Sequence, residues 1–267
     1  MFMNHAFTLD GNRDILGCDL TSVPMQNFAE ADNISSPQVF KQQKEATPAR
    51  NGIGKCGPRY RTVSALRFQA DQYAAHAAVY DEVSGEVIKS LGLFEIRTRC
   101  GDKFEMLTRP DLGRLFDEET QKIISEKCLH SPDVQIYVGD GLCSPSVAAN
   151  VPDMLPAITK SLEFDGISVG TPFFVRYCRV NTVRTVAELL KPKVTCVLIG
   201  ERPGLLTSKS MSAYIAYNAG YNMSESDYTV VSNISSVGMP PVEAAAHIAD
   251  IIRAMLEQKT SGYGLKY

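Results

Sequence analysis

The sequence predicts an α/β fold with an open, mostly parallel sheet and helices on both faces. Short apolar runs rich in β-branched residues recur between positions 134 and 231, and each is followed by a polar loop and a further apolar pattern. Strands that alternate with helices form parallel sheets covered on both sides. The 44% of hydrophobic residues in the chain is enough to fill the core that such a sheet needs.

Composition and charge exclude several classes of protein. The 267 residues carry a net charge of −3, so there is no electrostatic case for binding nucleic acid or an anionic membrane. No apolar run approaches the roughly 18 residues of a membrane span, and the N-terminus lacks the pattern of a secretory signal. The seven cysteines include no CxxC pair, and Cys178 and Cys196 lie in apolar strands, which suits buried, reduced thiols. We therefore expect a soluble intracellular protein.

Three segments are expected along the chain. Residues 1–50 are polar and without period, which predicts a disordered N-terminal arm. Residues 51–116 predict a helix over 62–83, a short helical piece over 87–91, and a hairpin of 93–99 with 103–107 around Gly101-Asp102. A loop carrying Arg109 and Arg114 completes this second segment. Residues 117–267 form the sheet domain, which opens with a helix over 117–128.

The sheet domain repeats a unit of strand, loop and helix four times. The predicted strands are residues 134–138, 173–177, 194–199 and 229–231. One helix is expected over 147–162, a second ends near 190, and the last ends near 258. The third should follow the strand 194–199, with Ser208 or Ser210 as its N-cap and Met211, Tyr214 and Ile215 on one face.

The loops of these units lie where each strand ends, and the carboxyl ends of parallel strands share one edge of a sheet. That edge should gather the polar residues Asp140, Arg179-Val180, Glu201-Arg202 and Asn233. Asp140 can accept a hydrogen bond from a ligand or can cap a turn. Glu201 and Arg202 can form a surface ion pair or contact a ligand, and the restraint from Pro203 and Gly204 favours the ligand role.

No catalytic set emerges from the residues. The four histidines are isolated, and there is no HExxH, GxSxG or GxxxxGK[ST] motif. Cys143 has no histidine placed to activate it, so an ordinary thiol is expected. The GxGxxG at 52–57 follows no strand and is interpreted as a flexible basic loop, whose Lys55, Arg59 and Arg61 could contact a phosphate. The residues indicate a binding domain with a polar crevice.

Several long motifs in this order resemble the small (light) subunit of ethanolamine ammonia-lyase. They are LTRPDLGR at 107–114, DGL at 140–142, GTPFFVRY at 170–177, GERPGL at 200–205 with SMSAY at 210–214, SNI at 232–234, and PPVEAAA at 240–246. The resemblance runs from about residue 57 to the C-terminus. It implies a Rossmann-like domain that covers adenosylcobalamin at the interface with a large subunit, where ethanolamine becomes acetaldehyde and ammonia.

The resemblance also implies cofactor positions at Val180, Glu201 and Val230. Relatives can carry a cysteine at the position of Val230. The cobalt is expected to keep the cofactor's own base as its lower ligand, because no Asp-x-His-x-x-Gly motif is present. The chain departs from the family pattern at a set of other positions: Gln72, Arg184, Ala187 and Ser235. These departures leave an alternative open, a non-catalytic relative that keeps the fold and the partner interface but has lost cobalamin binding.

The expected location is the cytoplasm, with a bacterial microcompartment as the alternative that the resemblance implies. The arm lacks the amphipathic opening helix that resembles a microcompartment-targeting peptide in relatives.

Overall fold

The computed structural model describes residues 34–47 and 49–266, which divide into two compact units. One unit contains the described residues up to Ala75 together with Gly204–Leu206. The other contains His76–Pro203 and Thr207–Tyr267. No helix in the described part of the chain is long and apolar enough to cross a bilayer.

The first unit contains helix α1, a small hairpin and most of helix α2. The helix α1 spans Pro37–Glu45, and the strands β1 (Lys55–Cys56) and β2 (Arg59–Tyr60) pair antiparallel. The predicted long helix is confirmed as α2, Thr62–Tyr80. The arm was expected to be disordered over residues 1–50. Residues 1–33 lie outside the described residues, and the expectation is wrong for α1.

The hairpin also shows what the glycine-rich motif at 52–57 does in the fold. Its glycines at 52 and 57 take positive φ angles of 75° and 62°, which only glycine adopts freely, and the chain then turns between β1 and β2. Neither strand leads into this loop from a parallel sheet, so rejection of a dinucleotide-binding turn is confirmed.

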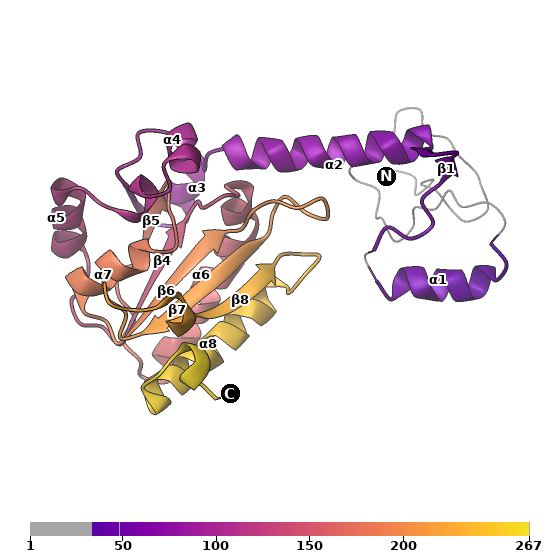
Figure 1. Cartoon of the computed structure of the whole chain (residues 1–267). Coiled ribbons are helices and arrows are strands. Elements are labelled where there is room, and N and C mark those ends of the chain that lie inside the picture. Colours follow the sequence, from indigo (N-terminus) through magenta and orange to yellow (C-terminus); the bar gives the residue numbers. More distant parts are fainter. Residues whose placement is uncertain (1–33, 48, 267) are drawn as a thin grey trace. The chain divides into compact units, whose positions relative to one another are not determined.

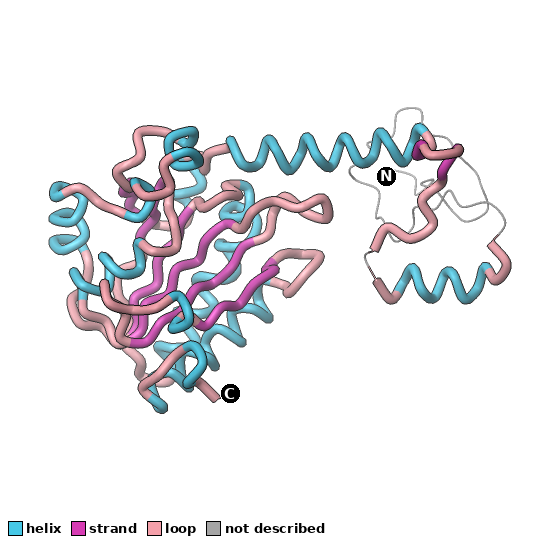
Figure 2. The backbone as a smooth tube through the Cα atoms, in the orientation of Figure 1, coloured by secondary structure: helices cyan, strands magenta, loops and turns pink. Residues whose placement is uncertain are grey.

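The second unit is built on a six-stranded sheet in the order β3-β5-β4-β6-β7-β8 (Figures 1 and 2). The strands are β3 (Phe94–Arg97), β4 (Val134–Gly139), β5 (Phe173–Arg176), β6 (Val194–Gly200), β7 (Met211–Tyr217) and β8 (Thr229–Ile234). Neighbouring strands from β3 to β6 are parallel, whereas β7 is antiparallel to both β6 and β8. Five of the six strands therefore point the same way, which confirms the α/β class and the mostly parallel sheet.

Helices cover both faces of this sheet. On one face, α6 (Pro145–Phe164) and α8 (Pro241–Gln258) pack with α3 (Gly85–Ser90) against residues such as Val138, Leu198 and Ile215. On the other, α5 (Glu118–Lys127) and α7 (Thr182–Leu190) pack against residues such as Tyr137 and Val197. All seven residues of β6 are buried, because helices cover both of its sides.

The predicted hairpin at 93–107 is wrong. Only its first half is a strand, β3, and it pairs parallel with β5 at the edge of the main sheet. The second half is a helix, α4 (Lys103–Thr108), which begins because the Asp102 carboxylate accepts a hydrogen bond of 2.7 Å from the Glu105 amide. Asp-x-x-Glu is a capping signal, and it competes successfully with the turn signal of Gly101-Asp102.

The predicted helix after the Glu201 loop is also wrong. Residues 211–217 form β7, which pairs with β6 from Val194↔Tyr217 to Gly200↔Met211. In such a short run, Met211, Tyr214 and Ile215 satisfy a helical period, but the buried Met211, Ala213 and Ile215 satisfy a strand period equally. The open edge of β6 decides the matter, since its backbone groups need a partner.

A prediction follows from the ion pair of Asp133, which lies just before β4. Hydrogen bonds from Lys193 and Ser168 lower the pKa of Asp133 from 3.8 to about 2. A lowered folded-state pKa stabilises the fold above pH 3.8, and this contribution disappears as the pH falls through 2. Asp133→Asn should therefore reduce the free energy of unfolding by about 1 kcal/mol at pH 7 and by nearly nothing at pH 2, because the exposed Lys193 is screened.

Urea unfolding at pH 7, 4 and 2 measures this difference. Asp153→Asn, on the exposed side of α6, is the matched control and should change the stability little at any of these pH values. A deficit of Asp133→Asn that stays constant down to pH 2 would contradict the assignment.

Candidate functional site

A crevice of about 290 Å³ opens at the carboxyl edge of the sheet, within the second unit. Its walls come from the ends of β4, β5 and β6 and from the neighbouring strands β7 and β8. The lining residues are Gly141, Leu142, Cys178, Arg179, Val180, Ile199, Gly200, Glu201, Arg202, Ser212, Tyr214 and Ser232. The predicted gathering of Arg179-Val180 with Glu201-Arg202 at this edge is therefore confirmed.

The floor of the crevice requires two glycines. Gly141 has a φ of 57°, and a Cβ there would lie 2.3 Å from the Gly200 carbonyl oxygen. This close approach lets the Leu142 amide donate a 3.0 Å hydrogen bond to Gly200 and joins the end of β4 to the end of β6. The crevice keeps its shape because backbone packs directly on backbone at this point.

Glu201 is held by three donors, one from the residue just before β7, one from β7 and one from β8. Ser210 Oγ donates to its Oε2, while Ser212 Oγ and the Asn233 amide, at 3.0 Å, donate to its Oε1. The carboxylate accepts from these donors and forms no ion pair with Arg202, so the alternative of a surface ion pair between these two neighbours is wrong. A carboxylate accepts about four hydrogen bonds, which leaves Glu201 about one free acceptor position.

Asn233 reaches Glu201 because of a β-bulge. Between Val231 and Ile234, β8 places Ser232 and Asn233 opposite the single residue Ser212 of β7. Asn233 has a φ of 59°, a left-handed conformation that asparagine tolerates better than most residues. The bulge leaves the Asn233 amide outside the regular ladder, and the Glu201 carboxylate accepts its hydrogen bond. Asn233 thus joins the site through its backbone, while its side chain is exposed.

Asp140 supports the crevice from below its surface. Its side chain is fully buried, and its Oδ1 accepts a 3.0 Å hydrogen bond from the Cys178 amide. Burial raises the pKa of Asp140, and the positive charge of Lys103 opposes this effect. Lys103 Nζ lies 3.5 Å from Asp140 Oδ2 and donates to the Gly141 carbonyl at 2.8 Å. Of the two roles weighed for Asp140, the structure favours the structural one.

Val230 lies on the same face of the sheet but outside the crevice. It lines a neighbouring hollow of about 380 Å³ together with Tyr228 and Tyr263, and 39% of its surface is exposed. Tyr214, which lines the crevice, is the direct partner of Val230 on the adjacent strand. Val180, Glu201 and Val230 are thereby arranged along one continuous stretch of the sheet.

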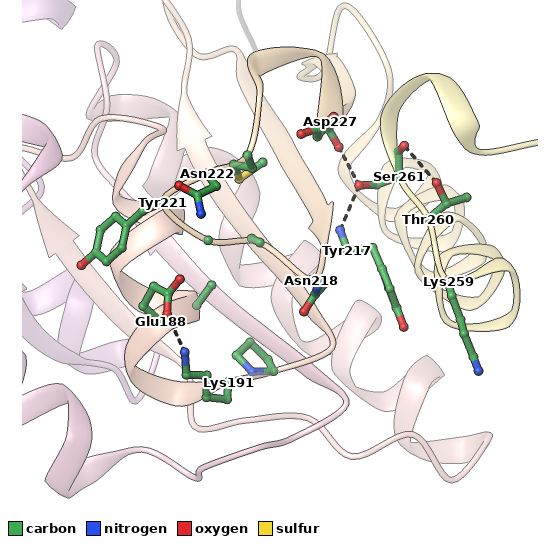
Figure 3. A pocket seen from close by; sticks show the side chains of 15 residues that line it. Glu188, Lys191, Tyr217, Asn218, Tyr221, Asn222, Asp227, Lys259, Thr260 and Ser261 are labelled. Atoms are coloured by element: carbon green, nitrogen blue, oxygen red, sulfur yellow. Dashed lines mark hydrogen bonds and ion pairs between the residues drawn. The ribbon is translucent and has the colours of Figure 1, made fainter.

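A larger hollow of about 560 Å³ lies elsewhere, where β7, α7 and α8 end (Figure 3). Its polar groups already contact one another. Glu188 pairs with Lys191, and Ser261 Oγ bridges the Tyr217 amide and the Asp227 carbonyl. Apart from Ala187, one of the departures from the family pattern, its lining contains none of the predicted site residues. It lies where β7 ends, and because β7 is antiparallel to β6 this is the edge opposite the carboxyl ends of the parallel strands. Because α/β sheets bind ligands at the carboxyl ends of their parallel strands, we favour the smaller crevice.

The described residues contain no group of three or more His, Cys, Asp or Glu side chains that could hold a metal ion. Burial raises the pKa of Cys178 and of Cys196 to about 12, and burial also raises the pKa of Cys143. These thiols are free and buried, as expected, and stay protonated at neutral pH. The crevice is therefore equipped to bind a ligand rather than to attack one.

Sequence reasoning missed three residues that build the site. Ser210 and Ser212 are expected at the start of a helix, whereas they orient Glu201 from the residue before β7 and from β7 itself. Lys103 was placed in a hairpin strand, whereas its buried ammonium group lies under the loop of Asp140. The capping signal at Asp102 could have revealed α4, but no local signal indicates which carboxylate a distant lysine or serine will contact.

Comparisons with known proteins agree on one family. Residues 37–266 match the family described as ethanolamine ammonia-lyase light chain (EutC). The ethanolamine ammonia-lyase small subunit of Clostridium perfringens is 48% identical over 248 residues, which cover 93% of this chain and 84% of that protein. The same subunit of Clostridium tetani is 50% identical over 249 residues, with 93% and 84% covered. That of Listeria monocytogenes is 43% identical over 248 residues, with 93% and 85% covered.

The buried pair beneath the crevice can be tested by removing one partner. Lys103→Met should lower the free energy of unfolding by about 3–5 kcal/mol, because it leaves the Asp140 carboxylate buried without its positive partner. Adding Asp140→Asn should recover part of this loss, since the amide keeps one acceptor for the Cys178 amide and carries no charge. Thermal and urea unfolding of the two variants measures the coupling, and a loss below about 1 kcal/mol for Lys103→Met would contradict it.

Proposed function

Because the chain belongs to the ethanolamine ammonia-lyase light-chain (EutC) family, we propose that its crevice binds adenosylcobalamin at the interface with the large subunit. The chain is one subunit of an ammonia-lyase, and the name small subunit implies a larger partner. The observation that carries the proposal is the position of Val180 and Glu201. These two of the three positions implied by the family resemblance line one crevice at the carboxyl edge of the sheet, and the third, Val230, lines the neighbouring hollow.

The crevice suits part of a corrinoid. Leu142, Val180 and Ile199 offer apolar surface, while Glu201 and Ser232 offer polar groups. A corrin ring has flat apolar faces and an edge of amide side chains that both donate and accept hydrogen bonds. A corrinoid is far larger than 290 Å³, so this chain would cover only part of it and the large subunit would cover the rest. The exposed Tyr263, beside Val230, provides apolar surface for that partner.

Glu201 is the residue best placed to contact an amide edge. Its three protein donors fix the orientation of the carboxylate before any ligand arrives, and its remaining acceptor position can receive one amide N–H. Asn233 contributes by holding Glu201, and Asp140 contributes by holding the loop of Gly141. We therefore propose Val180 and Glu201 as direct contacts, Val230 as a contact at the margin, and Asp140 and Asn233 as supporting residues.

The cobalt ion is proposed to keep the cofactor's own base as its lower ligand. None of the described histidines, His76, His130 and His247, lines the crevice. When bound, the cofactor supplies an adenosyl radical by homolysis of its Co–C bond, and the chemistry on ethanolamine belongs to the large subunit. This chain would bind the cofactor, orient its edge and exclude water from that side.

The departures from the family pattern lie mostly away from the crevice. Ser235 is buried and accepts a hydrogen bond from the Gly238 amide, so it shapes the turn after β8. Ala187 lines the larger hollow, and Gln72 is exposed on α2. Arg184 pairs with Glu225 beside the hollow of Val230. Val230 and Arg184 are therefore the two departures close enough to the proposed site to bear on whether cobalamin binding has been lost.

The proposed location is the cytoplasm, with a microcompartment as the alternative. The six described cysteines are all free, and five of them are buried, which suits a reducing compartment.

The division of labour gives one prediction. The isolated chain should deaminate nothing, because the described residues form no catalytic set that could abstract a hydrogen or replace an amino group. Incubating it alone with adenosylcobalamin and ethanolamine should give no acetaldehyde, whereas adding the large subunit should restore the activity. Acetaldehyde well above background from the chain alone would overturn the two-subunit proposal.

The second prediction concerns Glu201. Glu201→Gln keeps the size of the side chain but removes the charge that accepts from the ligand and from two serines. The reconstituted complex should bind adenosylcobalamin about tenfold to a hundredfold more weakly, since a hydrogen bond to a charged group is worth roughly 1.5–3 kcal/mol. Equilibrium dialysis followed by visible absorption measures this affinity.

Two further variants separate contact from support. Ser210→Ala removes one donor to Glu201 but leaves its charge, so it should weaken cofactor binding by much less than Glu201→Gln. Glu188→Gln, at the larger hollow, should leave the affinity unchanged. Equal losses for Ser210→Ala and Glu201→Gln would reduce Glu201 to a supporting residue, and unchanged affinity for Glu201→Gln would remove Glu201 from the site. A wild-type complex that binds no adenosylcobalamin would favour the relative that has lost cobalamin binding.

A further inference from the structure

Three arginines lie at or near the crevice, and none of them is paired directly with a carboxylate of the described residues. Arg179 and Arg202 line the crevice, and Arg114 lies close enough to Arg179 to influence its ionisation. None of the three forms an ion pair within residues 34–47 and 49–266. Among the other arginines of the second unit, Arg176, Arg184, Arg253 and Arg109 are paired with carboxylates, whereas Arg97 and Arg99 also form no ion pair within the described residues.

Arg179 is held in place by two hydrogen bonds, and its buried Nε donor is unused. Its Nη2 donates a 2.8 Å hydrogen bond to the Met106 carbonyl, and its backbone amide donates to Gly113 at 2.9 Å. Gly113 leaves the room for the side chain, since a Cβ there would lie 2.8 Å from Arg179 Cγ. Nε of Arg179 is buried and has no acceptor among the described residues. The side chain as a whole is half-buried and lines the crevice, so the rest of its guanidinium group is available to a ligand.

The surroundings make the charge of Arg179 costly without an anion. Burial lowers its pKa, and the positive charges of Arg114 and Arg202 act in the same direction. A guanidinium nevertheless stays protonated in a protein, so the repulsion is relieved by a negative ligand rather than by loss of a proton. The neighbouring carboxylate of Glu201 is already engaged with its three donors.

The helix behind the crevice contributes little to binding an anion. The α7 helix begins at Thr182, but the amides of Thr182, Val183 and Arg184 already donate to the carbonyls of residues 179–181. The amides that bind phosphate in a glycine-rich turn are therefore occupied here. An anion in this crevice would be bound by guanidinium groups.

From these observations we infer that Arg179 and Arg202, with Arg114 nearby, bind the phosphodiester of the nucleotide loop of the corrinoid. The inference rests on the proposed function, because it assigns one group of the proposed ligand to one side of the crevice. Ethanolamine is a cation at neutral pH and would be repelled here. The amide side chains of a corrinoid are neutral, so the phosphodiester is the group that complements these arginines, and guanidinium forks match phosphate oxygens.

Three corrinoids distinguish the parts of the ligand. Adenosylcobalamin contains phosphate and base, adenosylcobinamide phosphate contains phosphate without base, and adenosylcobinamide contains neither. Arg202→Gln is the first variant, because this side chain is exposed and forms no contact that the fold needs. In the reconstituted two-subunit complex, it should weaken binding of both phosphate-containing corrinoids by about tenfold and leave adenosylcobinamide unchanged.

Arg179→Gln should show the same pattern with a larger loss, and its melting temperature should be checked because Arg179 packs on Gly113. Arg109→Gln is the matched control: it removes one positive charge from the same loop as Arg114, but Asp111 already neutralises it. Arg109→Gln should bind all three corrinoids like wild type. The affinities are measured by equilibrium dialysis and visible absorption, without reference to turnover.

The outcomes separate this inference from the proposed function. Equal weakening of all three corrinoids by Arg202→Gln, or no weakening, would overturn phosphate recognition while cofactor binding stands. A wild-type complex that binds none of the three corrinoids would overturn the proposed function and the inference with it. Selective loss of the two phosphate-containing corrinoids supports the assignment.

Discussion

The pairing of β6 on both sides is the constraint on which the second unit depends. Its seven residues are buried, so each of its backbone groups needs a hydrogen-bond partner from a neighbouring strand. The parallel strand β4 supplies one side, and the antiparallel strand β7 supplies the other. Because β7 runs back along β6, its first residues return to the point where β6 ends. Ser210 and Ser212 thereby meet Glu201, and the crevice is assembled by the same pairing that completes the sheet.

Much of this sheet could be predicted from the sequence, because its central strands are mostly apolar. The strands β4, β5, β6 and β8 and the helices α5, α6, α7 and α8 were all found from pattern and punctuation. The sequence could not decide the fate of residues 211–217, because a seven-residue apolar run satisfies both periods and only the neighbouring strand selects one. The edge strand β3 was placed in a hairpin for a related reason: its partner, β5, lies about 80 residues further along the chain.

The site was predictable to the extent that it follows from topology. Strand ends share an edge, and this rule alone correctly predicts that Arg179, Val180, Glu201 and Arg202 lie together. The roles of the individual side chains did not follow, because they depend on contacts between distant residues. Asp140 is buried above a lysine from α4, and Asn233 contributes an amide that only a bulge could turn toward Glu201. Neither contact can be predicted from the residues that neighbour Asp140 or Asn233 in the sequence.

The bulge in β8 has a second consequence, which concerns the outer edge of the sheet. As the last strand, β8 has a free side that is covered only near its end, where Ile234 bridges Met239, and a regular edge of this kind invites pairing with strands of other molecules. The extra residue and the left-handed Asn233 interrupt the straight row of donors and acceptors near the crevice. An incoming strand would find only the short stretch from Thr229 to Val231 in regular register. The same irregularity that delivers an amide to Glu201 thus makes this edge a poor template for aggregation.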